Sequence, residues 1–195
     1  MAVTDAGADA IGLMFYEGSP RHGTLEQAHE ISAAVPPHVA RVGVFVNAEA
    51  AFIQQAVADC MLNILQFHGD ETPEQCSGYP VMTMKAFRVR GPETLEQLLE
   101  YGTDGFLLDA YSKEARGGTG ESFNWDLAVR AGEFGKPIFL AGGLTPDNVA
   151  DAVQQVRPFG VDVSSGVESA PGKKDADAVW SLVAAVRAAE RLPDA

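Results

Sequence analysis

The sequence predicts an α/β fold in which parallel strands alternate with helices, and three observations favour it. Short apolar runs alternate with segments that carry helix-start signals along the whole chain. The runs are almost continuously apolar, which is typical of strands in a parallel sheet covered on both faces. Near the C-terminus, two consecutive units each have a strand, a turn of small residues and a helix start, an arrangement that can hold a phosphate.

The expected elements follow from these runs and from helix-capping patterns. The strands are expected at residues 10–15, 41–46, 64–67, 81–87, 105–108, 138–140 and 160–163. A helix end is expected at residues 2–6, and helices at 24–35, 47–59, from 72, at 92–101, 124–134, from 145–148, and at 176–191. Thr24 and Thr72 each begin a capping box, and Asn47 and Asn124 are expected N-caps.

The length of 195 residues, with 46% hydrophobic and 21% charged residues, suits one globular domain over residues 1–195. A closed (β/α)8 barrel, the TIM barrel, has eight strands. We count seven, and the chain starts inside a helix. The open doubly wound sheet is the competing architecture, but its G-x-G-x-x-G signature after the first strand is absent.

Composition excludes several classes of function. A formal net charge of −13 argues against a nucleic-acid partner, which needs a basic face. No apolar run reaches the roughly 18 residues of a membrane span, and no secretory segment is visible, so we expect no membrane partner and a cytoplasmic location. Cys60 and Cys76 match no metal or redox spacing and are expected to be buried structural thiols.

In a parallel barrel the chemistry lies where strands end, so polar residues just past each strand are the candidates. Asp109 is the first acid–base candidate, because the apolar run 105–108 before it would favour its protonated form. A carboxylate that caps its own loop is an equally good interpretation. Asp162 alternates with Val161 and Val163 and is expected to point into the barrel, as a ligand-orienting group or a hydrogen-bond hub.

Three basic residues are candidates for contacts to an anionic ligand. Arg21 follows Ser19-Pro20, where its guanidinium could bind a carboxylate through two contacts or lie on the surface. His68 stands at a strand end and is either a ligand contact or a histidine that bonds nearby backbone. Lys85 lies inside a strand, so that its amine could reach a carboxylate or the substrate.

Two loops of small residues are expected to hold the phosphate with their backbone N–H groups. Their residues are Gly142 and Gly143 after one strand, and Ser164, Ser165 and Gly166 after the next. A third glycine-rich segment, residues 117–120, is either a lid beside the site or a plain flexible loop.

These residues fall in stretches that occur together in one known family. The stretches are 7–12, 15–21, 41–47, 66–71, 107–109, 117–120, 123–125, 141–144 and 161–168. Their order and content resemble the phosphoribosylanthranilate isomerase family of tryptophan biosynthesis, over nearly the whole chain. Other phosphate-binding barrels share only the phosphate loops.

The resemblance implies a (β/α)8 barrel and an Amadori rearrangement of N-(5′-phosphoribosyl)anthranilate to 1-(2-carboxyphenylamino)-1-deoxyribulose 5-phosphate. Asp109 would be the general acid that protonates the ribose ring oxygen and opens the ring to a Schiff base. A general base then removes the C2′ proton. Arg21 would bind the anthranilate carboxylate, and the two loops of small residues would bind the phosphate. The resemblance implies no cofactor and no metal.

The sequence departs from the family pattern at its start. The family's general base is a cysteine in a Lys-Ile-Cys-Gly stretch on the first strand, and this stretch is absent. We therefore expect a truncated barrel that lacks the first strand and the start of the first helix, with reduced activity and with self-association through open edges at Ile11 and Val161. The alternative function is a non-catalytic, phosphosugar-binding remnant of the same fold.

Overall fold

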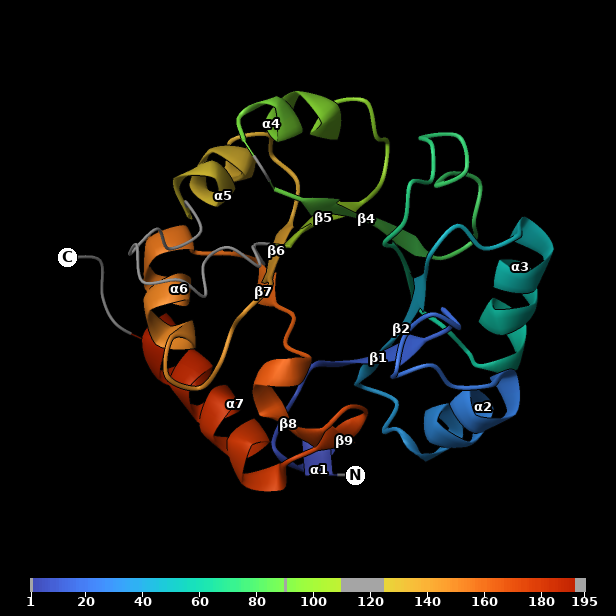
Figure 1. Cartoon of the computed structure of the whole chain (residues 1–195), viewed down its shortest axis with the longest axis horizontal. Coiled ribbons are helices and arrows are strands. Elements are labelled where there is room, and N and C mark those ends of the chain that lie inside the picture. Colours follow the sequence, from blue (N-terminus) through green and yellow to red (C-terminus); the bar gives the residue numbers. More distant parts are fainter. Residues whose placement is uncertain (1, 90, 110–124, 192–195) are drawn as a thin grey trace. The chain divides into compact units, whose positions relative to one another are not determined.

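The computed structural model describes residues 2–89, 91–109 and 125–191. Among these residues, seven strands form one sheet in the chain order β1-β2-β3-β4-β5-β6-β7, as the sequence predicts for an α/β fold. A helix lies between successive strands of this sheet except between β3 and β4, which a loop connects (Figure 1). The search of the described residues found no helix that is long and apolar enough to cross a membrane.

The chain divides into two compact units, which are described separately. The N-terminal unit extends to Ala86 and includes Tyr101–Asp104, and the C-terminal unit comprises Phe87–Glu100 and the residues from Gly105 onward. The lid expected at residues 117–120 and the cap expected at Asn124 lie outside the described residues.

The N-terminal unit contains the parallel strands β1 (Ala10–Met14), β2 (Ala40–Phe45), β3 (Ile64–Phe67) and most of β4 (Met82–Arg88). Its helices are α1 (Ala2–Asp5), α2 (Leu25–Ala34) and α3 (Ala50–Asp59). The predicted capping box at Thr24 is confirmed, because its side chain accepts from the Gln27 N–H and the Gln27 side chain accepts from the Thr24 N–H.

The core of the N-terminal unit forms where α2 and α3 cover these strands. Phe15 and Phe45 stack with ring centroids 5.0 Å apart, and the Phe52 ring of α3 meets both edge-on. Burying such aromatic side chains contributes about 1.5–3 kcal/mol each relative to exposure. This packing holds the C-terminal ends of β1 and β2 in place.

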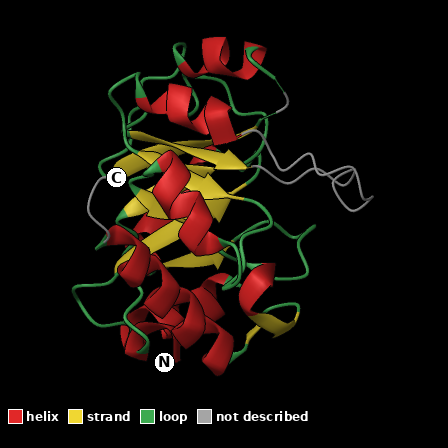
Figure 2. Ribbon diagram, turned by 90° about the vertical axis from the view of Figure 1, so that its left-hand side faces the viewer, coloured by secondary structure: helices red, strands yellow, loops and turns green. Residues whose placement is uncertain are grey.

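The C-terminal unit carries α4 (Glu93–Leu98), β5 (Gly105–Asp109), α5 (Trp125–Gly132), β6 (Ile138–Ala141), α6 (Val149–Val156) and β7 (Gly160–Val161). Beyond β7 come the 3-10 turn η2 (Ser165–Val167), the strands β8 (Glu168–Ala170) and β9 (Lys173–Lys174), and α7 (Ala176–Glu190). The β8–β9 hairpin is antiparallel and separate from the main sheet (Figure 2).

Two helix predictions in the N-terminal unit are wrong in detail. The capping contacts predicted at Thr72 form: the Gln75 N–H donates to the Thr72 hydroxyl at 3.4 Å, and the Thr72 N–H donates to the Gln75 side chain. These contacts close a single turn, however, and no helix follows it. Gly78, in the left-handed region at φ 80°, and Pro80 prevent the turn from continuing. Cys76 lies in this turn.

Asn47 is not a helix N-cap, since α3 begins at Ala50 with Glu49 in the cap position. The Asn47 backbone is left-handed, at φ 51°, and its Oδ1 accepts a hydrogen bond of 2.8 Å from the Asp70 N–H. The side chain therefore links the loops after β2 and β3. Asparagine is among the few residues other than glycine that adopt this conformation readily.

Candidate functional site

In the N-terminal unit the register of the sheet aligns the strand ends that carry the predicted polar residues. Met14 lies beside Val44, and Phe67 lies beside both Phe45 and Lys85. The loops that follow β1, β2 and β3 therefore all leave the sheet at the C-terminal ends of its strands. These loops carry Arg21, Asn47 and His68.

A buried ion pair connects the loop after β3 with strand β4 at these strand ends. The Lys85 amine lies 3.2 Å from the Glu71 carboxylate, and both side chains are almost completely inaccessible, at 4% and 3% exposure. Lys85 also donates to the backbone carbonyls of Phe67 and Gly69, at 3.2 and 2.7 Å. The carboxylate accepts from the N–H groups of Asn47 and Gly69 at 2.7 and 2.9 Å. Both buried charges are thus paired and hydrogen-bonded, as burial requires.

Of the two roles that the sequence leaves open for Lys85, the structure gives it the contact with a carboxylate. Sequence reasoning missed the partner, Glu71. The only feature of the sequence that could have pointed to Glu71 is its position, four residues past the end of β3. A carboxylate in such a loop is ordinarily expected to be exposed.

The His68 ring is oriented by a buried glutamine. Its Nδ1 lies 2.8 Å from Oε1 of Gln66, a residue that is 4% exposed. The His68 N–H donates to the Phe45 carbonyl at 2.8 Å, which fixes the backbone of the residue as well. The histidine is therefore held at the strand end where the sequence placed it.

Arg21 lies in a loop that turns back on the end of β1. The Gly23 N–H donates to the Met14 carbonyl at 3.0 Å, and the Arg21 N–H donates to the Ser19 hydroxyl at 3.1 Å. The first hydrogen bond ties the end of the loop to β1, and the second fixes the backbone within the loop. The Arg21 side chain is half-buried.

In the C-terminal unit, Asp109 is the last residue of β5 and lies beside Ala141, the last residue of β6. Leu107 and Leu108 before it are fully buried, and Asp109 itself is half-buried. Its carbonyl accepts from the Val89 N–H at 3.2 Å, which ties the end of β5 to the residue after β4. The carboxylate therefore stands at an anchored strand end.

The glycine turn after β6 needs glycine for its backbone. Gly142 and Gly143 have φ of 89° and 67°, in the left-handed region that side chains disfavour. The Asn148 side chain shapes the turn from the other end. Its Nδ2 donates to the Gly143 carbonyl at 3.0 Å, and its Oδ1 accepts from the Thr145 N–H at 2.8 Å. Asn148, expected only as part of a helix start, thus holds the turn.

The loop after β7 packs directly on this glycine turn. Asp162 follows β7, is exposed, and donates its N–H to the Leu140 carbonyl at 2.9 Å. A Cβ added to Gly166 would lie only 1.9 Å from the Leu144 carbonyl oxygen, so the two backbones are in contact there. Ser164 and Ser165 are exposed. The two predicted anion-binding loops are thus neighbours within one unit.

Replacing Gly166 with alanine is expected to separate these loops. The added methyl group would overlap a backbone oxygen, which cannot rotate away, and such overpacking costs about 1–3 kcal/mol. The affinity for inorganic phosphate, measured by titration calorimetry, is expected to fall at least about tenfold. Gly132→Ala is the matched control, because nothing lies within 4 Å of its added Cβ. Equal affinities in the two variants would contradict the expectation.

Both cysteines are buried, as predicted, at 0% and 2% exposure. The pKa of the Cys76 thiol is raised to about 12, mainly by burial; the Lys85 ammonium opposes this effect and the Glu71 carboxylate adds to it. Burial, followed by the charge of Asp59, raises the pKa of Cys60. Neither thiol is suited to act as a general base near neutral pH.

Iodoacetamide is therefore expected to alkylate both cysteines of the folded chain slowly at pH 7. We expect a rate at least about 100-fold below that of the chain unfolded in guanidinium, because thiolate content and access both limit the reaction. Mass spectrometry of time points measures the rate. Rapid labelling of Cys76 in the folded chain would contradict the burial of its thiol.

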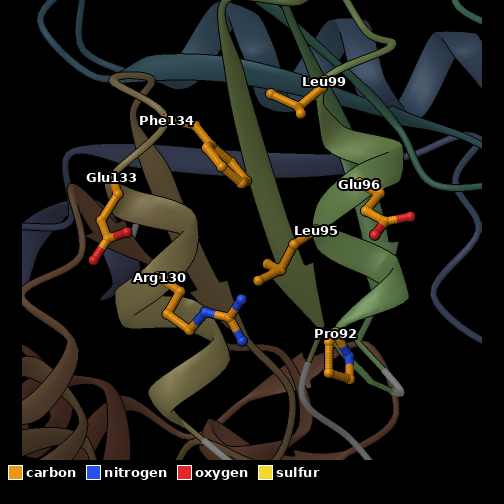
Figure 3. A pocket seen from close by; sticks show the side chains of 7 residues that line it. All are labelled: Pro92, Leu95, Glu96, Leu99, Arg130, Glu133 and Phe134. Atoms are coloured by element: carbon orange, nitrogen blue, oxygen red, sulfur yellow. The ribbon is translucent and has the colours of Figure 1, made fainter.

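The described pocket is separate from these strand ends. A cavity of about 180 Å³ lies between α4 and α5, and none of the predicted site residues lines it (Figure 3). Its lining residues are Pro92, Leu95, Glu96, Leu99, Arg130, Glu133 and Phe134. In the described part of the chain, no group of three or more His, Cys, Asp or Glu side chains is arranged to hold a metal ion.

Comparisons with known proteins give a consistent result. Residues 1–185 match the family described as N-(5'phosphoribosyl)anthranilate (PRA) isomerase. An N-(5'-phosphoribosyl)anthranilate isomerase from Trichlorobacter lovleyi is 52% identical over 183 residues, which are 94% of this chain and 89% of the relative.

Two solved structures are similar over 96% of this chain. Phosphoribosyl anthranilate isomerase from Thermotoga maritima has a TM-score of 0.87 and 39% identity, with 92% of that chain covered. A second isomerase structure, in complex with reduced 1-(o-carboxyphenylamino)-1-deoxyribulose 5-phosphate, has a TM-score of 0.84 and 37% identity, with 91% covered. On its sequence match and its fold, the chain belongs to the phosphoribosylanthranilate isomerase family.

Proposed function

We propose that this protein is a phosphoribosylanthranilate isomerase of tryptophan biosynthesis that acts in the cytoplasm on a phosphosugar substrate. The reaction is the Amadori rearrangement of N-(5′-phosphoribosyl)anthranilate to 1-(2-carboxyphenylamino)-1-deoxyribulose 5-phosphate. The observation that carries the proposal is the arrangement of the C-terminal unit. A carboxylate at the end of β5 stands one strand from a glycine turn, and that turn packs against a second loop of small residues.

In this proposal Asp109 is the general acid. It donates a proton to the ribose ring oxygen as the C1′–O bond breaks, which leaves an open-chain Schiff base. Asp109 is half-buried and directly follows the fully buried Leu107 and Leu108, so it lies at the end of the strand, where a general acid can meet the substrate. Removal of the C2′ proton then gives the enolamine, which tautomerises to the ketone.

Backbone amides and one guanidinium are assigned to the anionic groups of the substrate. The backbone N–H groups of the two loops of small residues bind the phosphate, because such amides present partial positive charge without a cationic side chain. The loop residues are Gly142, Gly143, Ser164, Ser165 and Gly166. Arg21 binds the anthranilate carboxylate, and His68 and Asp162 contact the remainder of the substrate. With a net charge of −13, the protein depends on such local donors to attract an anion.

We further propose that β1 corresponds to the second strand of the family's (β/α)8 barrel, in a single domain over residues 1–195. The 195 residues contain no Lys-Ile-Cys-Gly stretch, and both cysteines present are buried. The group that removes the C2′ proton is therefore not one of these thiols. Loss of a general base lowers turnover by about 10²–10⁴-fold, so the chain by itself is expected to be slow.

A fluorescence assay tests the proposal, since the anthranilate group of the substrate fluoresces and its signal falls on conversion. Turnover is measured for the 195-residue chain and for the same chain preceded by a segment that carries Lys-Ile-Cys-Gly. The proposal requires conversion by the extended chain. Turnover of the 195 residues within tenfold of the extended chain would contradict the assignment of the missing base.

The second candidate function is phosphosugar binding without catalysis, and the absence of the cysteine-bearing stretch favours it. This function predicts that a product analogue binds at micromolar concentration and that the extended chain shows no conversion. The same two proteins should be compared by sedimentation. Self-association through open edges predicts that the 195-residue chain forms oligomers and that the extended chain does not.

A further inference from the structure

The β8–β9 hairpin, which the sequence did not predict, places Lys174 beside the loop at Ser164. Lys174 lies opposite Glu168 in the hairpin register, and its amine is 3.2 Å from the Glu168 carboxylate. The Glu168 side chain is 4% exposed, while that of Lys174 is 32% exposed. A nearly buried carboxylate needs its cation, so the amine is held in this position.

The same amine donates a hydrogen bond of 2.8 Å to the Ser164 carbonyl oxygen. That oxygen also accepts from the Val167 N–H, but at 3.5 Å, so the lysine makes the shorter contact. The hairpin itself is anchored, because the Asp175 N–H donates to the Val167 carbonyl at 2.9 Å and Asp175 caps the long helix α7. Lys174 therefore holds the Ser164 carbonyl from a fixed base.

Holding this carbonyl also directs the next amide. The described chain has no cis peptide bond, so the Ser164 C=O and the Ser165 N–H lie on opposite sides of one planar peptide group. With the oxygen turned toward Lys174, the N–H points the other way. A charged donor on the oxygen also polarises the peptide group, which makes its N–H a stronger donor to an anion.

We propose that Lys174 is a positioning residue for phosphate binding, which acts through the Ser164 carbonyl to aim and strengthen the Ser165 N–H. This inference rests on the proposed function, because it takes the loop at Ser164 as the site of the substrate phosphate. Lys174 itself does not contact the phosphate. Its effect is on the affinity for phosphorylated ligands and not on the proton transfers.

The neighbouring Lys173 provides a matched control. It has the same charge one residue away, and it is exposed. Lys174→Met and Lys173→Met therefore remove the same net charge, and only the first removes the hydrogen bond to Ser164. Lys174→Arg keeps both the charge and a donor. Lys174→Gln keeps a neutral donor and serves if the methionine variant fails to fold.

The probe is inorganic phosphate, titrated while amide resonances are followed by NMR, so that the measurement does not depend on turnover. Lys174→Met is expected to raise the phosphate Kd about tenfold, in line with a hydrogen bond to a charged group, and to reduce the shift of the Ser165 amide. Lys173→Met and Lys174→Arg should stay within about twofold of the unmodified chain, and Lys174→Gln should fall between. In the extended chain, Lys174→Met should raise KM with little change in kcat.

Equal phosphate affinities for the two methionine variants would overturn the inference, because long-range charge alone would then explain both. A Lys174→Gln variant that binds like the unmodified chain would overturn it as well. Isomerase turnover by the extended chain together with either result would leave the proposed function intact. A chain that neither binds phosphate nor converts the substrate when extended would overturn both proposals.

Discussion

Replacing Asp109 with asparagine is expected to lower isomerase turnover by about 10²–10⁴-fold, the usual contribution of a general acid. The amide has nearly the same shape as the carboxyl group but has no acidic proton to give to the ribose ring oxygen. The affinity for phosphate should not change, because the anion loops follow β6 and β7 while Asp109 ends β5. The fluorescence assay on the extended chain measures turnover, and phosphate titration measures affinity.

Asp151→Asn is the control for this substitution. Asp151 is exposed on α6 of the same unit, so that its replacement removes one negative charge without touching a strand end. Its turnover should match that of the unmodified chain. If Asp109→Asn keeps turnover within tenfold of this control, Asp109 is not the general acid and its carboxylate serves the loop instead.

Replacing Glu71 with alanine is expected to destabilise the N-terminal unit by about 3–5 kcal/mol, the cost of leaving a buried cation unpaired. Lys85 would remain at the edge of the sheet with its carboxylate partner removed. The N–H groups of Asn47 and Gly69 would lose their acceptor at the same time. Urea unfolding measures the change in the free energy of unfolding.

A double variant separates charge from packing in this prediction. Glu71→Leu combined with Lys85→Met removes both charges, and it should be less destabilised than Glu71→Ala. Glu74 is exposed in the adjoining turn and makes only local hydrogen bonds, to its own backbone and to Thr72, so Glu74→Ala should lower the unfolding midpoint far less than Glu71→Ala. A midpoint for Glu71→Ala equal to that of Glu74→Ala would show that the buried pair does not stabilise the fold.

The strands were predicted well because a buried parallel strand can be recognised from a few consecutive apolar residues. The segments at Ile64–Phe67 and Gly105–Asp109 are examples, each within one residue of expectation. The candidates Asp109 and His68 were found by the same reasoning, since a polar residue after such a run must lie at a strand end. Their roles stay predictions.

What the sequence did not predict depends on contacts between distant residues. Lys85 lies in β4 and its partner, fourteen positions away, lies in the loop after β3, where no local pattern marks Glu71 as buried. Asparagine is a common N-cap residue, which is why Asn47 was predicted to cap a helix. Its side chain instead accepts a hydrogen bond from the N–H of Asp70, twenty-three positions along the chain, and so links two loops. The hairpin at Glu168–Lys174 is short and polar, so it lacks the apolar signal by which strands are predicted.

The contact between Gly166 and the Leu144 carbonyl has a consequence for how the anion site responds to acidity. Loops this close leave no room for a side chain at the point of contact, and the donors of the proposed phosphate site are main-chain amides. Amides do not titrate in the range where proteins are folded, unlike histidine. In the proposed phosphate site, the affinity for the dianion is therefore expected to stay constant with pH, and occupancy is expected to follow the second ionisation of the phosphate monoester, near pH 6.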